Sequence, residues 1–311
     1  MPRLVVEPWS AEYGGPLDFE TDPDEAPAVV PGSEGPWEPM ASEASLPSVI
    51  AFVDGVRRPD ARLTVDEGGS ALPIPGVAGS YAVGAVRWYP EECRSEFDEI
   101  RIERVVVCGE GAKVELPPVG PGLVYTSMSS PERSVQSLVQ TFHGAMRVAE
   151  DDLAEDLARA GYLVFADGPI NTLSALRKVG YIKTHRVSYL PPELIGIIPE
   201  LGGGQRTPFF RIPDYKRNSW YLRLGDFADG HSWSGVVRCE VAHAVGDEMT
   251  IELANISTTV LPMLGSEPFR DPRAPQNLVP IAGLERELRR RLGAAPLIHR
   301  FVTEAVQQVA V

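Results

Sequence analysis

The sequence predicts a mixed α/β fold built around one central sheet with flanking helices. Three observations support this class. Short apolar runs typical of buried strands alternate with a long stretch of helical periodicity, and two of those runs end in Asp-Gly, at residues 54–55 and 167–168. The third is the alternation of apolar and polar residues within 207–253, which predicts an inserted β meander.

The first 47 residues differ in composition from the rest of the chain. They hold ten acidic residues and a single arginine, and so carry −9 of the net charge of −14. A segment rich in Pro, Gly and acids is typical of an extended, partly disordered arm. Trp9 and Trp37 are its candidate anchor points. We expect residues 1–47 to form this arm and residues 48–311 to form the folded domain.

The first half of that domain begins with strands and continues into a helix. Residues 48–53 predict a buried strand that ends at Asp54, and further strands are expected at 80–88 and 100–108. A long helix is predicted next, because apolar residues recur at steps of three and four: Val135, Leu138, Val139, Phe142, Met146, Ala149, Leu153 and Leu157. Gly161 ends this helix.

The second half continues with two short strands, the meander and two helices. Residues 162–166 predict a buried strand ending at Asp167, and 179–183 predict its neighbour. Helices are expected over 281–292 and from about 297 to 309.

The two Asp-Gly pairs are the clearest candidates for chemistry. Ligands of α/β proteins bind where strands end, and carboxylates from neighbouring strands, joined by one from a helix, can hold two divalent ions about 4 Å apart. Hard oxygen ligands suit Mg²⁺ or Mn²⁺. Asp-Gly is also a common turn dipeptide, so the interpretation depends on both copies following strands.

A third carboxylate is expected on the helix that precedes Asp167. A helical wheel turns Asp151 and Glu155 away from the apolar stripe. Glu150 and Asp156 lie at its two edges. The residues alone leave both as candidates.

The order of these motifs resembles the NurA family of DNA nucleases, which have a ribonuclease H-like core. The resemblance spans roughly residues 49–292. It rests on five short motifs and on a C-terminal Pro-rich turn that opens a final helix. The motifs are Val53-Asp54-Gly55, Arg147-Val-Ala-Glu150, Asp167-Gly168, Gly180-Tyr-Ile-Lys183 and the arginine-bearing strand Val236-Val-Arg-Cys-Glu240. It implies a ribonuclease H-like central sheet and a NurA-like nuclease domain.

The resemblance also implies which residues form the site. Asp54, Glu150 and Asp167 match the family's metal ligands, so it selects Glu150 over Asp156. The family's Tyr-Pro and Ala-His are missing from residues 273–285, and Glu285 stands about where that histidine would be. Glu285 is either a fourth metal ligand or a capping or ion-pairing residue. Asp271 is the competing fourth acid.

Lys183 follows a predicted strand beside this site. We hypothesise that its ammonium contacts the scissile or a neighbouring phosphate. The alternative is an exposed lysine at a strand end.

As a function, the resemblance implies a two-metal DNA nuclease using Mn²⁺ or Mg²⁺, acting in end resection during double-strand break repair or in phage defence. It further implies a homodimer docked on a HerA-type hexameric ATPase. Two alternatives stay open. One is a catalytically inactive scaffold subunit, favoured by the missing Tyr and His. The other is a different ribonuclease H-like enzyme, acting on RNA or as part of a mobile-element defence system.

Other site types lack their signatures. The three cysteines and five histidines show no ligand-like spacing, and the glycines at 202–204 lack the Lys-Ser/Thr of a phosphate-binding loop. No apolar run approaches the ~20 residues of a membrane span, and no secretory signal is evident, so we expect a cytoplasmic protein without a membrane partner. The acidic charge is unusual for a DNA-binding protein, although local basic stretches such as 286–291 permit it.

Overall fold

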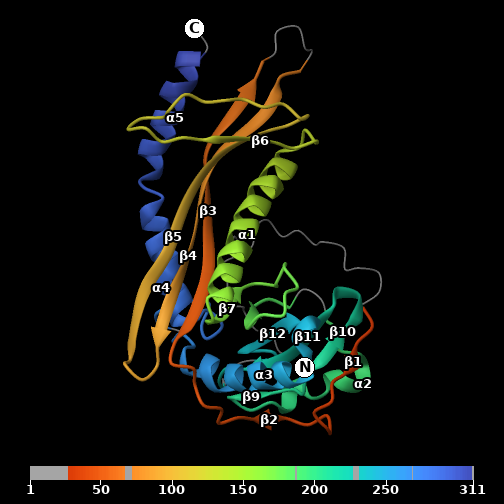
Figure 1. The fold of residues 1–311 in the computed structure, drawn as a ribbon. Coiled ribbons are helices and arrows are strands. Elements are labelled where there is room, and N and C mark those ends of the chain that lie inside the picture. Colours follow the sequence, from red (N-terminus) through yellow and green to blue (C-terminus); the bar gives the residue numbers. More distant parts are fainter. Residues whose placement is uncertain (1–26, 67–71, 186–187, 227–230, 268, 310–311) are drawn as a thin grey trace. The chain divides into compact units, whose positions relative to one another are not determined.

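The computed structural model describes residues 27–66, 72–185, 188–226, 231–267 and 269–309. It confirms the predicted mixed α/β class, with helices flanking a large mixed sheet (Figure 1). The 12 strands of the sheet follow the order β1-β10-β11-β12-β8-β7-β3-β4-β5-β6, and β9 pairs with both β11 and β2. The strands are β1 (Val30–Pro31), β2 (Met40–Ala41), β3 (Ile50–Val65), β4 (Ile74–Tyr89), β5 (Arg94–Cys108), β6 (Thr126–Ser129), β7 (Leu163–Asp167), β8 (Lys178–Ile182), β9 (Gln205–Arg206), β10 (Phe210–Ile212), β11 (Arg217–Arg223) and β12 (Val236–Ala242). The helices are α1 (Val135–Arg159), α2 (Pro192–Ile195), α3 (Gly246–Met263), α4 (Val279–Arg291) and α5 (Ala295–Val309), with 3₁₀ turns η1 (Ile198–Glu200), η2 (Pro213–Tyr215) and η3 (His243–Val245).

The described residues divide into two compact units. Of the described residues, unit 1 comprises 27–52, Val86–Glu96 and those between Ala154 and Ala282. Unit 2 comprises the described residues between Val53 and Ala85, the segment Phe97–Leu153, and residues 283–309.

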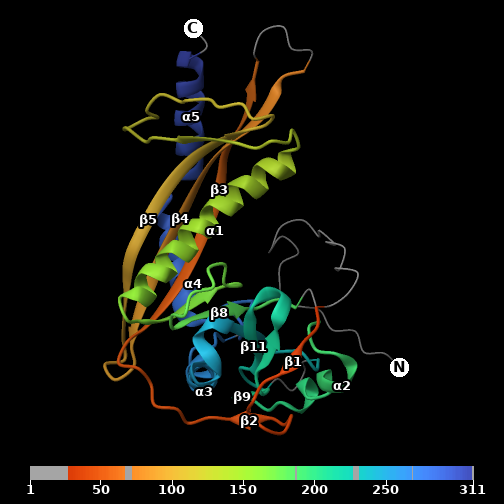
Figure 2. The same cartoon turned by 45° about the vertical axis from the view of Figure 1, so that its right-hand side comes forward.

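Unit 2 is a three-layer arrangement around the long strands β3, β4 and β5 (Figure 2). A Cβ on Gly79 of β4 would lie 2.7 Å from Phe142 of α1, whereas a Cβ on Gly84 would lie 3.1 Å from Leu288 of α4. Residues 79 and 84 have opposite parity and therefore face opposite sides of the strand. Helix α1 thus covers one face, and α4 covers the other.

Strand β3 differs from its prediction. The strand was expected to end at Asp54, but it continues for 16 residues to Val65. A Cβ on Gly55 would lie 3.2 Å from Met146 and 3.3 Å from the Glu150 carboxyl carbon, both on α1. Gly55 therefore permits the close approach of a helix and does not form a turn.

Unit 1 contains the predicted meander. Strands β10, β11 and β12 are successive antiparallel neighbours, and β12 pairs antiparallel with β8. Strands β7 and β8 are parallel. One part of the prediction was wrong: residues 246–253, assigned to the meander, form the first two turns of α3.

The two faces of β11 bury different cores. Trp220 and Leu222 pack in a cluster with Leu253 and Val260 of α3. Tyr221, one residue out of phase, packs on the opposite face with a second cluster that includes Leu190, Ile198 and Phe210. Alternation along a strand explains this division, and it makes unit 1 a sheet covered on both sides.

The described part of the predicted arm, residues 27–47, lies on unit 1. Strand β1 pairs with β10, and β2 pairs with β9. Trp37 donates its indole N–H to the carbonyl of Leu194 and meets Phe210 edge-on, at 6.4 Å between ring centroids. The other candidate anchor, Trp9, lies outside the described residues. Among the helices that the structure describes, none is both long and apolar enough to span a bilayer.

Candidate metal centre

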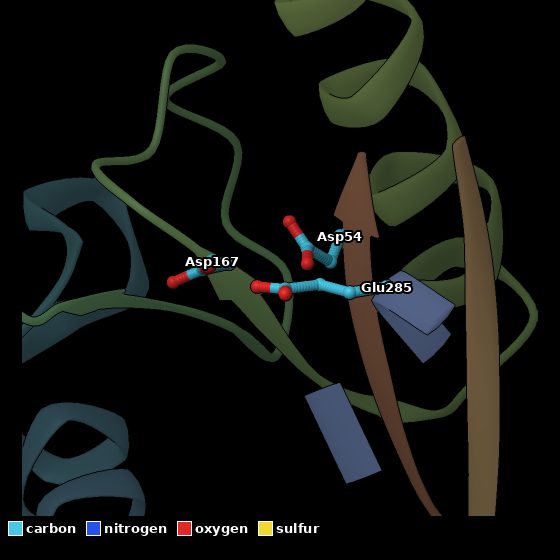
Figure 3. Close-up of side chains that lie close together, drawn as sticks. All are labelled: Asp54, Asp167 and Glu285. Atoms are coloured by element: carbon cyan, nitrogen blue, oxygen red, sulfur yellow. The ribbon is translucent and has the colours of Figure 1, made fainter. Parts of the chain in front are cut away.

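Three carboxylates lie close together in the structure. Asp54, Asp167 and Glu285 each offer one oxygen, and these oxygens are all within 4.8 Å of one another (Figure 3). Asp54 and Glu285 are buried, and Asp167 is partly exposed. The structure therefore groups three of the four predicted metal ligands.

The strand pairing explains the positions of the two aspartates. Strand β7 is the neighbour of β3 in the sheet, and Phe52 stacks on Phe165 with 5.5 Å between ring centroids. Asp54 and Asp167 follow these phenylalanines by two residues. Side chains two apart on a strand share a face, so the stack fixes the face that each aspartate occupies.

The turn after Asp167 is held by hydrogen bonds. Gly168 has φ +100°, a conformation that favours glycine, and its N–H donates to the carbonyl of Tyr181 at 2.8 Å. Two residues later, the N–H of Ile170 donates to Glu240 Oε1 at 3.0 Å. This second Asp-Gly is therefore a true strand end.

Lys183 contacts one of the three carboxylates directly. Its Nζ lies 2.6 Å from Asp167 Oδ2, and it also donates to Asn277 Oδ1 at 3.0 Å. The Lys183 side chain is only 5% exposed, so the alternative of an exposed lysine at a strand end is wrong. The phosphate contact stays a hypothesis.

Asp271, the competing fourth acid, lies outside the group of three. It is buried and accepts hydrogen bonds from Asn277 Nδ2 at 2.6 Å and from Arg273. Burial alone would raise the pKa of Asp271, but the hydrogen bonds from Arg273 and Asn277 outweigh it and hold the pKa below its usual value. Asp271 is thus connected to Asp167 indirectly: Asp271 bonds Asn277, Asn277 bonds Lys183, and Lys183 bonds Asp167.

Glu285 projects from α4 and has a cationic partner on the same helix. Arg289 Nη1 lies 3.2 Å from Glu285 Oε2, four residues away along the chain. The Glu285 side chain is 5% exposed, whereas that of Arg289 is 58% exposed. Glu285 is therefore ion-paired, as one of its two expectations stated, and it also belongs to the carboxylate group. Its ligand role stays a prediction.

Glu150 is not one of the three grouped residues. It is partly buried on α1, where its carboxyl carbon lies against Gly55. Arg57 lies two residues after Gly55 on β3 and so shares its face of the strand. Burial lowers the pKa of Arg57, and the negative charge of Glu150 partly offsets that effect. The ligand role of Glu150 stays a prediction.

The helical wheel misplaced one acid of α1. Glu155 was expected to point away from the apolar stripe, but it is 3% exposed. It accepts hydrogen bonds from Lys178 at 3.1 Å and from Ser174. A buried cation on the neighbouring strand therefore draws this carboxylate inward. Asp156, the alternative to Glu150, is exposed and lies 3.8 Å from Arg159.

The donor set fits a hard divalent cation. All three grouped side chains are carboxylates, which suit Mg²⁺ or Mn²⁺ better than metals that prefer thiolate or imidazole. Three formal negative charges at this spacing repel one another, and burial strengthens that repulsion. A divalent ion would relieve it.

Sequence reasoning missed Asn277 and Arg289 as neighbours of the site. Arg289 had a usable signal, because residues four apart on a helix meet. Asn277 had none, since it follows a Pro-rich segment without periodicity.

Comparison with known proteins adds little to this geometry. No protein-family model matches the chain, and no curated protein sequence matches it significantly. Among solved structures, the chain is similar to the NurA nuclease from Sulfolobus solfataricus, with a TM-score of 0.44, 10% sequence identity and coverage of 81% of each chain.

Proposed function

We propose that this protein is a metal-dependent nuclease that hydrolyses phosphodiester bonds in DNA. The observation that carries the proposal is the group of carboxylates formed by Asp54, Asp167 and Glu285. Acidic groups of this kind hold the metal ions that stabilise the attacking and leaving oxygens of phosphodiester cleavage.

Each residue has a role that follows from its contacts. Asp54, Asp167 and Glu285 would hold the metal, and Glu150, beside Gly55, is the candidate for a further ligand. When bound, divalent ions supply charge stabilisation and an activated water. The ammonium of Lys183 lies beside the Asp167 carboxylate, and there its positive charge would attract a phosphate oxygen of the substrate.

The finer features of the proposal rest on the resemblance described above. They are a pair of Mn²⁺ or Mg²⁺ ions, a homodimer, and a HerA-type hexameric ATPase that feeds DNA ends to the nuclease. A net charge of −14 supports the dependence on a partner, because an acidic protein binds DNA weakly on its own.

A cleavage assay tests the proposal. The full chain is incubated with linear duplex DNA and Mn²⁺, with and without a HerA-type ATPase, and duplex DNA is compared with single-stranded DNA and RNA. We expect Asp54→Asn, Asp167→Asn and Glu285→Gln each to reduce DNA cleavage by more than about 100-fold. Losses of up to about 100-fold are typical of residues that only orient a metal ligand, so a direct ligand should exceed them. Glu304→Gln, an exposed acid of α5, is the matched control. Full activity in the Asp54→Asn/Asp167→Asn double variant would reject the proposal, and a preference for RNA would reject its substrate.

A second candidate function is a catalytically inactive scaffold of an ATPase complex. Two of the three carboxylates have cationic partners in Lys183 and Arg289, an arrangement that could stabilise the acids without a metal. The two functions differ in Mn²⁺ binding: the scaffold predicts none in the micromolar range, and the nuclease predicts binding.

A further inference from the structure

We infer that Asn277 and Asp271 are positioning residues, which together hold the ammonium of Lys183 against Asp167. The inference rests on the proposed function, because it assigns a role to residues around the proposed metal centre. Neither residue belongs to the carboxylate group, and Asp271 acts only through Asn277.

The orientation of the Asn277 amide is determined by its two neighbours. A lysine ammonium can only donate hydrogen bonds, and an ionised carboxylate can only accept them. The amide therefore turns its oxygen to Lys183, at 3.0 Å, and its nitrogen to Asp271 Oδ2, at 2.6 Å. With either neighbour absent, one reason for this orientation is lost.

Asp271 is itself anchored. Its Oδ1 accepts the backbone N–H of Arg273 at 2.8 Å and Arg273 Nε at 3.2 Å. Asn277 is completely buried, and Lys183 is nearly so. The chain of contacts from Arg273 through Asp271, Asn277 and Lys183 to Asp167 therefore lies largely out of water, where each link constrains the next.

This series of hydrogen bonds affects the affinity of the site for a metal ion, because Lys183 and a bound cation would share Asp167. The ammonium lies on Asp167 Oδ2, and two positive charges near one carboxylate repel each other. Holding Lys183 in place thus lowers the affinity of the centre for a divalent ion while keeping a positive charge beside it for the substrate. We expect Lys183→Met to bind Mn²⁺ about tenfold more tightly and to cleave DNA more slowly.

A double-mutant cycle tests whether Asn277 acts through Lys183. Mn²⁺ affinity is measured by calorimetry on the full-length wild type, Lys183→Met, Asn277→Leu and the double variant. We expect Asn277→Leu to bind Mn²⁺ more tightly than the wild type, and the double variant to match Lys183→Met. Additive effects, or an unchanged affinity in Asn277→Leu, would overturn the inference.

A swap variant guards against simple loss of folding. In Asp271→Asn/Asn277→Asp, the new carboxylate at 277 can accept from Lys183 and from the amide at 271, so these two contacts are retained with the same net charge, whereas the bond from Arg273 Nη2 to Oδ2 of residue 271 is lost. We expect the swap to restore wild-type Mn²⁺ affinity relative to Asn277→Leu, and failure to restore it would count against the inference. Asn218→Leu is the matched control, since Asn218 is also a fully buried asparagine, bonded instead to Thr250 at 2.8 Å. Its Mn²⁺ affinity should equal that of the wild type, and tighter binding in this control would count against the inference too.

The two proposals fail in different ways. Absence of Mn²⁺ binding by the wild-type chain would overturn both. Additive effects in a chain that binds Mn²⁺ and cleaves DNA would overturn only the positioning role of Asn277.

Discussion

Glu34 and Arg206 form an ion pair from which water is excluded. Glu34 Oε1 lies 2.6 Å from Arg206 Nη2 and Oε2 lies 2.9 Å from Nη1, while the two side chains are 2% and 0% exposed. Glu34 Oε2 also accepts the backbone N–H of Phe209 at 2.6 Å. This pair attaches the N-terminal segment to the rest of unit 1 at a point that no sequence pattern indicated.

Glu34→Ala should lower the free energy of unfolding by about 3–5 kcal/mol, because it leaves the Arg206 charge buried and uncompensated. Urea denaturation measures the change. Glu304→Ala is the control, since its pair with Arg300 is exposed and worth at most about 1 kcal/mol. A loss at Glu34 no larger than at Glu304 would contradict the assigned role.

Phe165→Ala should lower the free energy of unfolding by about 3–5 kcal/mol, the usual cost of emptying a buried phenylalanine site. Phe165 is completely buried and stacks on Phe52. Because the stack also sets the face of Asp54 and Asp167, Mn²⁺ affinity should fall as well. Phe269→Ala, at a residue 79% exposed, should change stability by no more than about 0.5 kcal/mol and leave Mn²⁺ affinity unaltered.

His143 should make stability depend on pH. Burial, with smaller contributions from Arg57 and Arg147, lowers the pKa of His143 from 6.5 to about 4. Between these values the unfolded chain binds a proton that the folded chain does not, so the His143 contribution is complete above pH 6.5 and is lost as pH falls towards 4. Urea unfolding at pH 7 and pH 4.5 should show a smaller loss of stability in His143→Gln than in the wild type. Equal losses of stability in the variant and the wild type would exclude His143 as a source of the pH dependence.

The three cysteines should differ in reactivity. Cys93 is exposed, whereas Cys108 and Cys239 are buried, and burial raises the pKa of both buried thiols. Because the thiolate is the reactive form, a thiol-specific disulfide reagent should modify one thiol quickly in the native protein and all three in denaturant. Rapid modification of two or three native thiols would contradict the described burial.

The sequence predicted elements best where a single periodicity decided them. Helix α1 and strand β7 lie within one or two residues of their expected bounds because each buries one continuous apolar pattern. Helix α3 was missed because its second half carries β-branched and hydroxyl residues, Ile256 to Val260, whose helical propensity is low. Packing against the core of unit 1 overrides that propensity, and this packing cannot be seen in the sequence.

The two Asp-Gly pairs show where site prediction reached its limit. They are identical dipeptides after similar apolar runs, yet Gly168 turns the chain with φ +100°, and Gly55 lies within a continuing strand against α1. The aspartates were identified correctly as neighbours, but the reason given for Asp54 was wrong. The contacts of Lys183 with Asn277 depend on tertiary structure and had no counterpart in the sequence.

The central claim is that Asp54, Asp167 and Glu285 share a divalent cation, and a crystal structure with Mn²⁺ tests it most directly. Anomalous scattering locates the ion independently of any assay. We predict a manganese peak with one carboxylate oxygen from each of the three residues at about 2.1–2.2 Å, close to the distances of small hard cations. A crystal with manganese bound elsewhere and these three carboxylates lacking a shared ion would contradict it.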